Sequence, residues 1–277
     1  MKFCFLLLAL SLMFWGCTGE ESLGVDTQAP NKPELVPHLG DTGDIIQNYQ
    51  GNSDTLNFYN IYSDINFENN GIDAMMEGDW LKIQWFRLED SDIDYLKIFR
   101  FSAQEYYNAI DTLNFAQIID TVNYEDQIYY VDKTSTTDKN YFYFIEAIDN
   151  AGNSTLSDTT GYKLIDKPYL ISPADYYSCE SNDIYDIVFE WEQVGDVFYF
   201  RLLVFSEDRE LIWQQTMLDT GSFNVQYDGP PVDPGSVLIW RIDAFGSTYS
   251  TPNPIEGNYY IVESGAESVE RTLSIHR

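Results

Sequence analysis

A two-residue alternation of large apolar side chains is the feature of this sequence that most restricts its fold. The stretch NYFYFIEAIDNAGNS has four apolar residues of one parity, three of them large, and these would lie on one face of an extended strand: Tyr141, Tyr143, Ile145 and Ala147. The stretch ends in DNAGN, a cluster of turn-forming residues. The pattern therefore predicts a half-buried β-strand that ends in a tight turn.

The same alternation recurs in shorter runs upstream. The run LKIQWF places Leu81, Ile83 and Trp85 on one face. The run DIDYLKIFRF does the same for Leu96 and Ile98, and QIYYVD has the length of a short strand. Short alternating strands with turns between them are typical of an antiparallel β-sandwich.

These motifs resemble a fibronectin type III domain. In that family Trp85 would lie in strand B, the run 96–100 would form strand C and the run 141–153 would form strand F. The resemblance covers about 80–165, and the strand F motif is its most specific part. It implies a β-sandwich that serves as an extracytoplasmic spacer or interaction module.

The second half of the chain repeats the pattern. The aligned positions of strand F are Trp240 with Tyr143, Ile242 with Ile145, and Ala244 with Ala147. The runs IYDIVFEW and DVFYFRLLVF alternate, with four residues of the second sharing a face: Phe198, Phe200, Leu202 and Val204. The closing RTLSIHR would be strand G.

The sequence therefore predicts an all-β chain of two tandem sandwich domains, fibronectin type III-like or immunoglobulin-like. We place the first at 33–167 and the second, more divergent one at 168–277. Trp85 and Trp191 would fill equivalent positions in strand B, each in a core of its own. We expect two such cores to unfold separately.

A long insert separates an expected strand A at Pro33–Pro37 from strand B. The insert, 41–79, is too long for an ordinary connection in a sandwich and too aromatic for simple disorder. A second unusual stretch, Tyr106 to Leu113, has the composition of a helical turn.

The N-terminal segment predicts export. Lys2 precedes an apolar run, Phe3 to Trp15, that is too short to cross a bilayer as a helix. Its end, Phe14-Trp15-Gly16-Cys17, resembles the lipobox of bacterial lipoproteins. The resemblance implies that residues 1–16 are a signal peptide and that Cys17 is acylated. Residues 17–32 would then be a flexible tether from the outer membrane or cell surface.

The charge of the chain excludes some partners. With 15 basic and 45 acidic residues, the formal net charge is −30, so nucleic acid is not an expected partner. The acidity serves solubility, or else some acidic loops bind calcium. Asp64, Asn66 and Glu68 begin like an EF-hand loop, but Gly71 falls two positions late.

No catalytic motif stands out. His38 and His276 are the only histidines and lie far apart in the chain, and Cys179 has neither nearby in sequence. We therefore expect no enzymatic activity, no catalytic residue, and Cys179 as a small residue that is buried or partly buried.

Strand parity also predicts an aromatic outer face on the first domain. If Ile98 and Ile145 point inward, Phe99, Phe142 and Phe144 point outward on neighbouring strands C and F. Aromatic residues of the insert would cover this face: Phe58, Tyr59, Ile61, Tyr62 or Phe67. The rival prediction leaves it bare for a partner.

The function that follows is a lipid-anchored, non-catalytic interaction or spacer module of the cell envelope, with an unidentified protein or glycan as partner. Two alternatives remain open. One is a carbohydrate-binding surface lipoprotein, because exposed aromatic rings can stack on sugars. The other is a non-catalytic subunit of an envelope machine.

Overall fold

The computed structural model describes most of the two predicted domains. The described residues are 26–36, 70–102, 116–123, 127–137, 139–195, 197–246, 249–252 and 259–277. Cys17, most of the insert and Tyr106–Leu113 lie outside them. Within the described ranges, no helix has both the length and the apolarity that a membrane crossing requires.

The first half is a sandwich of two sheets. One sheet has three strands in the order β1-β2-β5: β1 (Ile72–Ala74), β2 (Leu81–Gln84) and β5 (Tyr129–Asp132). The opposite strands are β3 (Ile93–Ser102), β4 (Gln117–Asn123), β6 (Asn140–Asp149), β7 (Ser154–Leu156) and β8 (Thr160–Leu164). The pairing of β3 with β6 is the pairing expected for strands C and F.

The second half repeats this arrangement. Its small sheet has the order β14-β11-β9: β9 (Tyr169–Ser172), β11 (Val188–Glu192) and β14 (Asn224–Gln226). The opposite strands are β10 (Tyr177–Glu180), β12 (Tyr199–Ser206), β13 (Leu211–Leu218), β15 (Val237–Phe245), β16 (Tyr249–Pro252), β17 (Tyr259–Glu267) and β18 (Arg271–His276). A short 3₁₀ helix, η1 (Ile184–Asp186), precedes β11.

The alternating residues form the cores, as the sequence predicts. In the first half, the small-sheet residues Leu81 and Ile83 pack with Tyr141 and Tyr143. In the second half, one buried cluster contains Trp191, Phe200, Leu202, Val204, Trp240 and Ile242. The prediction is wrong for Phe198, which is 52% exposed, because β12 begins only at Tyr199.

The end of the predicted insert is part of the sandwich. Strand β1 lies within 41–79 and pairs with β2, with Ile72 opposite Ile83. Of the expected strand A, the described residues 33–36 contribute an isolated bridge, between Leu35 and Trp85. The insert therefore ends before β1, since a strand of three residues gave too little alternation to detect.

Strand G is broken in the same way in both halves. In the first half the break between β7 and β8 is at Ser157, whose Oγ accepts a hydrogen bond from the Ile145 amide at 2.9 Å. In the second half the break between β17 and β18 is at Ser268, whose Oγ accepts one from the Ile242 amide at 3.0 Å. Ile145 and Ile242 are aligned in the sequence, so the two halves are built alike in detail.

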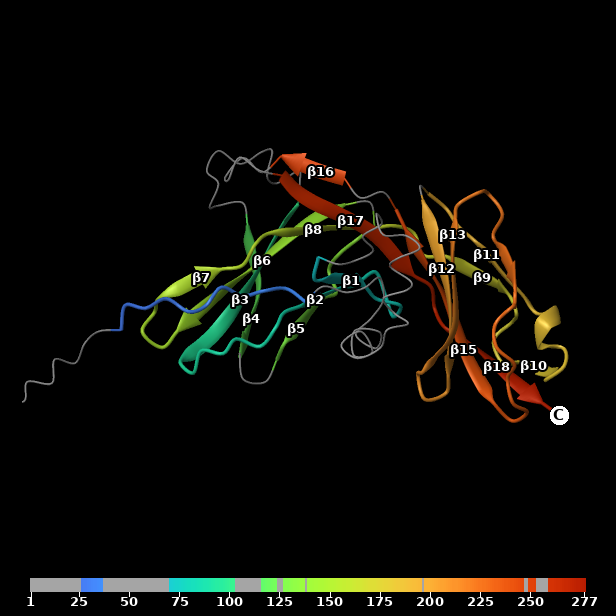
Figure 1. Cartoon of the computed structure of the whole chain (residues 1–277). Helices are drawn as coiled ribbons and strands as arrows, with labels where there is room; N and C mark the ends of the chain where they lie inside the picture. Colours follow the sequence, from blue (N-terminus) through green and yellow to red (C-terminus); the bar gives the residue numbers. More distant parts are fainter. Residues whose placement is uncertain are drawn as a thin grey trace, which may run out of the picture.

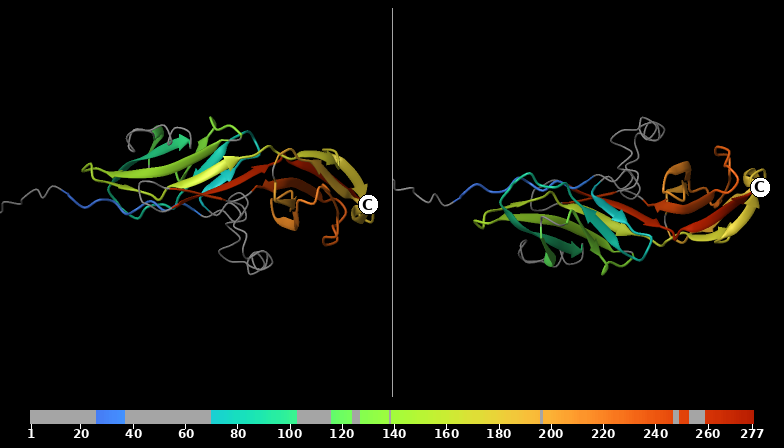
Figure 2. Two further views of the ribbon diagram at one scale, coloured as in Figure 1. Left: turned by 90° about the horizontal axis from the view of Figure 1, so that it is seen from above. Right: turned by 90° about the horizontal axis from the view of Figure 1, so that it is seen from below.

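One strand joins the two halves. Strand β17 pairs with β15 of its own half and, in parallel, with β8 of the first half, with Val262 opposite Gly161. A 12-stranded sheet therefore runs through the whole molecule, which is elongated (Figures 1 and 2). Ala266 of β17 packs in the second core, whereas Val262, on the same side of β17, packs on the outer face of the first half. The two small sheets thus cover opposite faces of the shared sheet.

Candidate functional site

The predicted aromatic face exists as stacked ring pairs across β3 and β6. The ring centroids of Phe99 and Phe144 lie 4.6 Å apart, and those of Phe101 and Phe142 lie 4.9 Å apart. Phe99 and Phe144 are half-buried, whereas Phe142 is only 2% exposed. The face is therefore not bare at Phe142.

A strand of the second half lies beside Phe142. Gly161 of β8 is opposite Phe142 on one side and Val262 on the other. A Cβ at Gly161 would lie 2.9 Å from the Phe142 ring and 3.0 Å from a Val262 methyl group. Phe142 and Val262 thus meet over the space that Gly161 leaves free. The insert residues expected to cover this face, 58–67, lie outside the described residues.

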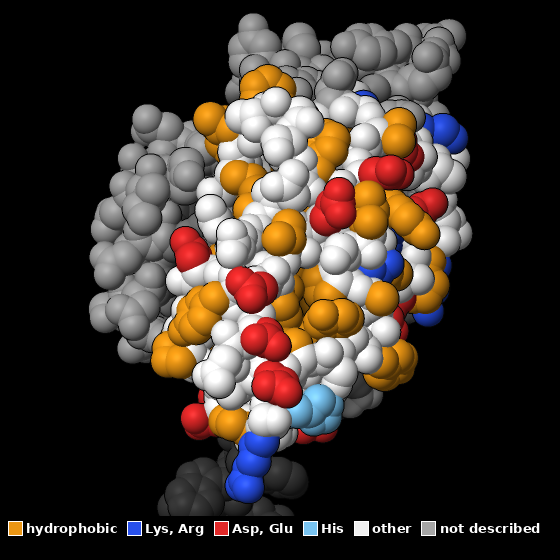
Figure 3. All heavy atoms as spheres, turned by 90° about the vertical axis from the view of Figure 1, so that its right-hand side faces the viewer, with side chains coloured by type: hydrophobic (Ala, Val, Ile, Leu, Met, Phe, Trp, Pro, Cys, Tyr) orange, Lys and Arg blue, Asp and Glu red, His pale blue; other side chains and the backbone are white. Residues whose placement is uncertain are grey.

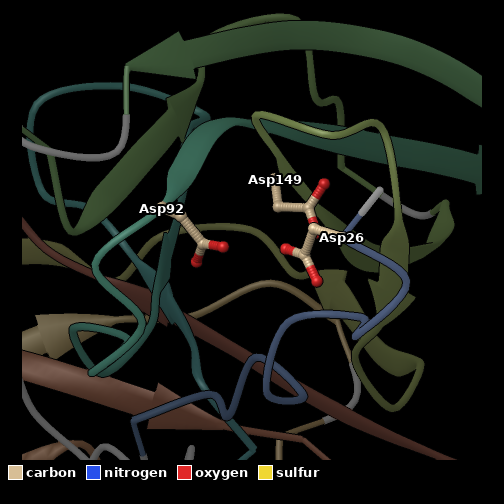
Figure 4. Close-up of side chains that lie close together, drawn as sticks. All are labelled: Asp26, Asp92 and Asp149. Carbon is tan, nitrogen blue, oxygen red and sulfur yellow. The ribbon is translucent and has the colours of Figure 1, made fainter. Parts of the chain in front are cut away.

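Three carboxylates come together at the end of the first half where the chain enters it. The Asp26, Asp92 and Asp149 groups each have an oxygen within 4.8 Å of the others (Figure 4). A cleft of about 280 Å³ beside them is lined by Asp26, Glu89, Asp90 and Asp92 among others.

Carboxylate oxygens are the ligand type that calcium prefers, but the described contacts at this cluster are those of a turn. Both Asp149 oxygens already accept hydrogen bonds, from the amides of Ala151 and Asn153 and from the Asn153 side chain. Burial alone would raise the pKa of Asp149, but these hydrogen bonds lower it. The EF-hand-like positions 64–68 lie outside the described residues.

A buried ionic network crosses the outer side of the second half. Arg201 Nη2 lies 2.8 Å from Asp243 Oδ2, and Arg241 Nε lies 2.9 Å from Asp243 Oδ1. Arg241 Nη2 is 2.8 Å from Glu267 Oε1, an ion pair without the alignment of a hydrogen bond. The network ties β12, β15 and β17 together. Sequence analysis missed it, although charged residues inside buried strands were a visible signal.

Burial sets the protonation of this network. Burial raises the pKa of Glu267 to about 7, because the loss of hydration outweighs the attraction of Arg241. Burial alone would lower the pKa of Arg241, but the charges of Asp243 and Glu267 raise it. Because the charges are paired with one another and lie buried within the sheet, we assign this network a role in the fold and not in binding.

The end of the molecule farthest from residue 26 is acidic and aromatic. The stretch 168–200 contains no Lys, Arg or His, and four of its carboxylates lie in 175–186: Asp175, Glu180, Asp183 and Asp186. Tyr176, in the same segment, is 79% exposed. Figure 3 shows hydrophobic side chains interspersed with carboxylates on this end face.

The segment 175–186 concentrates these features, and we call it the distal tyrosine surface. It carries the exposed rings of Tyr176, Tyr177 and Tyr185, and its strand β10 pairs with β18. Tyr176 has a φ of 57°, a left-handed backbone conformation that turns its ring outward at the corner. Asp175 Oδ1 fixes this corner by accepting hydrogen bonds from the Tyr176 and Thr272 amides, at 3.0 and 2.8 Å.

The other carboxylates of this surface are not neutralised by neighbours. Within the described part of the chain, Glu180, Asp183 and Asp186 form no ion pair. Arg271, at the start of β18, donates its hydrogen bonds to the carbonyl oxygens of Leu170, Ile171 and Pro173. The residue opposite Glu180 in the pairing of β10 with β18 is His276, which is neutral in the formal charge at pH 7. The surface therefore carries net negative charge next to exposed aromatic rings.

A serine and a histidine also meet at this end. Ser178 Oγ hydrogen-bonds to His276 Nε2, but among the described residues no carboxylate accepts from Nδ1 to complete a triad. Cys179 is partly buried, as the sequence predicts, and burial together with Asp183 raises the pKa of its thiol. A thiol held in its neutral form is a poor nucleophile.

Strand pairing and core composition define the class of the protein: an all-β chain with a fibronectin type III-like sandwich in each half. A comparison with protein-family models finds no match, and neither does one with curated proteins.

Two solved structures illustrate the likeness in fold. The FN1–FN3 domains of chicken CNTN1 match 72% of this chain and 62% of that chain, at 14% identity and a TM-score of 0.27. CopC from Methylosinus trichosporium OB3b matches 40% of this chain and 96% of that chain, at 16% identity and a TM-score of 0.25. The match thus spans less than two thirds of the CNTN1 structure. At these TM-scores the fold assignment rests on the strand pairing described above.

Proposed function

We propose that this chain is an exported protein, held to the outer membrane or cell surface by acyl chains on Cys17, that acts as a non-catalytic interaction module. The lipobox-like end of the N-terminal segment supports the anchor. Two or more acyl chains would hold the protein stably, whereas one chain gives only marginal binding.

The observation that carries this proposal is the placement of the two ends. The segment 26–36 runs along the first half, starting at the end away from the second half (Figure 1). It is fixed there by an ion pair between Lys32 Nζ and Asp158 Oδ1 at 2.6 Å and by hydrogen bonds from Asn31 to Asp90. The distal tyrosine surface and the C-terminus lie at the opposite end. A lipid at Cys17 would thus leave the distal tyrosine surface facing away from the membrane.

The contacts at the distal end support a non-catalytic role. Ser178 and His276 have no orienting carboxylate in the described part of the chain, and the Cys179 thiol has a raised pKa. The strand pairing between the halves, of β8 with β17, suits a spacer that holds a binding surface away from its anchor.

Replacing the lipidated residue tests the anchor. We expect Cys17→Ser to release the protein into a soluble fraction or to leave it unprocessed, and Cys179→Ser, the matched control, to stay with the membrane. Mass spectrometry of the mature N-terminus checks the modification. An unmodified N-terminus that starts elsewhere than at residue 17 would contradict the proposal.

A further inference from the structure

We propose that the distal tyrosine surface, Asp175 to Asp186, binds an extended basic segment of a partner protein, which adds as a strand beside β10. This inference names the partner class for the proposed interaction module and so rests on that function. Three features of the described residues carry it: the charge of the surface, its exposed rings and the position of β10 in the sheet.

Charge selects the partner. Between Lys167 and Arg201 the chain has no basic residue, and the carboxylates of Glu180, Asp183 and Asp186 have no ion-pair partner in the described ranges. In the first half, by contrast, Asp132 and Glu146 are paired with Arg100 and Lys97. A surface of one sign attracts partners of the opposite sign and disfavours nucleic acid and anionic lipid.

The exposed tyrosine rings also favour a partner with Lys or Arg side chains. Tyr176, Tyr177 and Tyr185 lie among the carboxylates of 175–186 within one stretch of chain. A Lys ammonium or an Arg guanidinium binds well where a ring face and a carboxylate are both within reach, since the ring contributes a cation–π interaction. The chain itself uses such contacts elsewhere: Lys133 Nζ lies 4.2 Å from the centroid of the Trp80 ring.

The sheet supplies a place for the backbone of the partner. In the described residues β10 pairs with β18 and with no other strand, so it is an edge of the 12-stranded sheet. Edge strands in natural proteins are commonly protected by short length, by charged side chains or by Pro; β10, YSCE, is short, and its one charged residue, Glu180, would repel an acidic strand and attract a basic one. An extended peptide can therefore hydrogen-bond to this edge, while its alternate side chains meet Tyr176, Tyr185 and the carboxylates.

A titration with defined peptides tests the inference. The full chain, in mild detergent, is titrated into the fluorescein-labelled peptide KTKTKTKTK, and fluorescence anisotropy is followed. We expect saturable binding that weakens at least fivefold between about 50 and 300 mM salt, because exposed charges are screened over a Debye length. The acidic peptide ETETETETE should not bind. The basic peptide with alternate N-methylated amides should bind at least fivefold more weakly, since it lacks donors for the β10 edge.

Variants locate the site. We expect at least a fivefold loss for the pair Asp183→Asn and Asp186→Asn, and for the pair Tyr176→Ala and Tyr185→Ala. The charge-matched control is Glu89→Gln with Asp94→Asn, two exposed carboxylates of the first half. The ring control is Tyr129→Ala, which is exposed on β5. Both controls should bind like the wild type, and circular dichroism should show that every variant is folded.

Each other outcome overturns the inference. Equal weakening by the control pair would mean that the net charge of the chain alone attracts the peptide. Full binding of the N-methylated peptide would exclude strand addition. Absence of peptide binding below about 1 mM, with binding of neutral cellohexaose or chitohexaose that Tyr176→Ala abolishes, would assign the surface to glycans. Cys17→Ser protein separates the two proposals, because it loses the anchor and should keep peptide binding.

Discussion

The two halves of this molecule share a detailed plan and differ in one strand. In both, a tryptophan of the small sheet is buried, and its amide donates a hydrogen bond of 3.0 Å: Trp85 to the Ile128 carbonyl and Trp191 to the Phe223 carbonyl. In both, strand G breaks at a serine. Before the break, β7 of the first half has three residues, whereas β17 of the second has nine.

The longer strand of the second half makes contact with the first half. Because β17 extends past its own sandwich, it pairs with β8 and brings Val262 against Phe142. In this molecule, the longer strand before the shared type of break joins the two sandwiches in one sheet. We therefore expect the halves to unfold together, in place of the separate units that strand patterns alone indicate.

Removal of a core tryptophan tests this coupling with the largest expected effect. We expect Trp191→Ala and Trp85→Ala each to cost about 3–5 kcal/mol of unfolding free energy, because each leaves a large cavity. Calorimetry should show a single transition for both variants, moved to lower temperature. Tyr169→Ala, at an exposed position of β9, serves as the control. Two separate transitions in Trp191→Ala would mean that the pairing of β8 with β17 does not couple the halves.

The cores were predictable from the sequence because they follow a two-residue period. Tyr143, Ile145, Trp240 and Ile242 all lie on the inner faces that parity assigns to them. The pairing of β17 with β8 was not predictable, because a parallel contact between strands about 100 residues apart has no local pattern. The three-residue strand β1 was too short for its alternation to be read.

The candidate site was predictable only in part. Parity indicates correctly that Phe99 and Phe144 stack on one face, but it carries no information on what lies beside Phe142. The distal tyrosine surface has a sequence signal in retrospect, the long run without a basic residue. Composition averaged over the chain hides that signal, because acidic residues outnumber basic ones throughout.

A methyl group in the space over Gly161 would test the contact between the two halves. We expect Gly161→Ala to cost about 1–3 kcal/mol, because its Cβ would press on both Phe142 and Val262. Chemical denaturation measures the loss. Val262→Ala should relieve part of it in the double variant, since it makes room for the new methyl group. A strictly additive double variant would contradict the contact. Gly152→Ala, at a site with open space around it, reports the cost of backbone strain alone.

The two serines at the strand breaks test whether the halves are equivalent. We expect Ser157→Ala and Ser268→Ala each to lower the unfolding free energy by about 1–2 kcal/mol, because each leaves a buried amide, of Ile145 or Ile242, without its acceptor. Denaturant titrations of both variants should give losses that agree within error. A large loss at one site and none at the other would mean that the shared geometry has different roles in the two halves.

The smallest expected effect is on the pH dependence of stability. The buried carboxylates of the two halves should change the stability with pH in opposite directions. In the first half, burial alone would raise the pKa of Asp132, but hydrogen bonds from Thr134, Tyr143 and Arg100 lower it. Because the pKa of Asp132 is lower in the folded state, its ionised form stabilises the fold above the pKa of the unfolded chain, near 4. This contribution to the unfolding free energy is lost as the pH falls further. In the second half, the pKa of Glu267 is raised to about 7, so the folded state binds the extra proton between about 4.5 and 7.

The Glu267 contribution to stability is therefore largest at acidic pH and is lost as the pH rises through 7. We expect the melting temperature to fall between pH 5.5 and 8 by on the order of 2 °C from this group, since Arg241 partly offsets the cost of its ionisation. Glu267→Gln should remove that part of the change, whereas the exposed control Glu190→Gln should not. Asp132→Asn should reduce the fall in melting temperature below pH 4 and leave the change between pH 5.5 and 8 as in the wild type. If Glu267→Gln keeps the full wild-type slope between pH 5.5 and 8, the buried network of the second half is not the group that titrates, and the two halves do not differ in this respect.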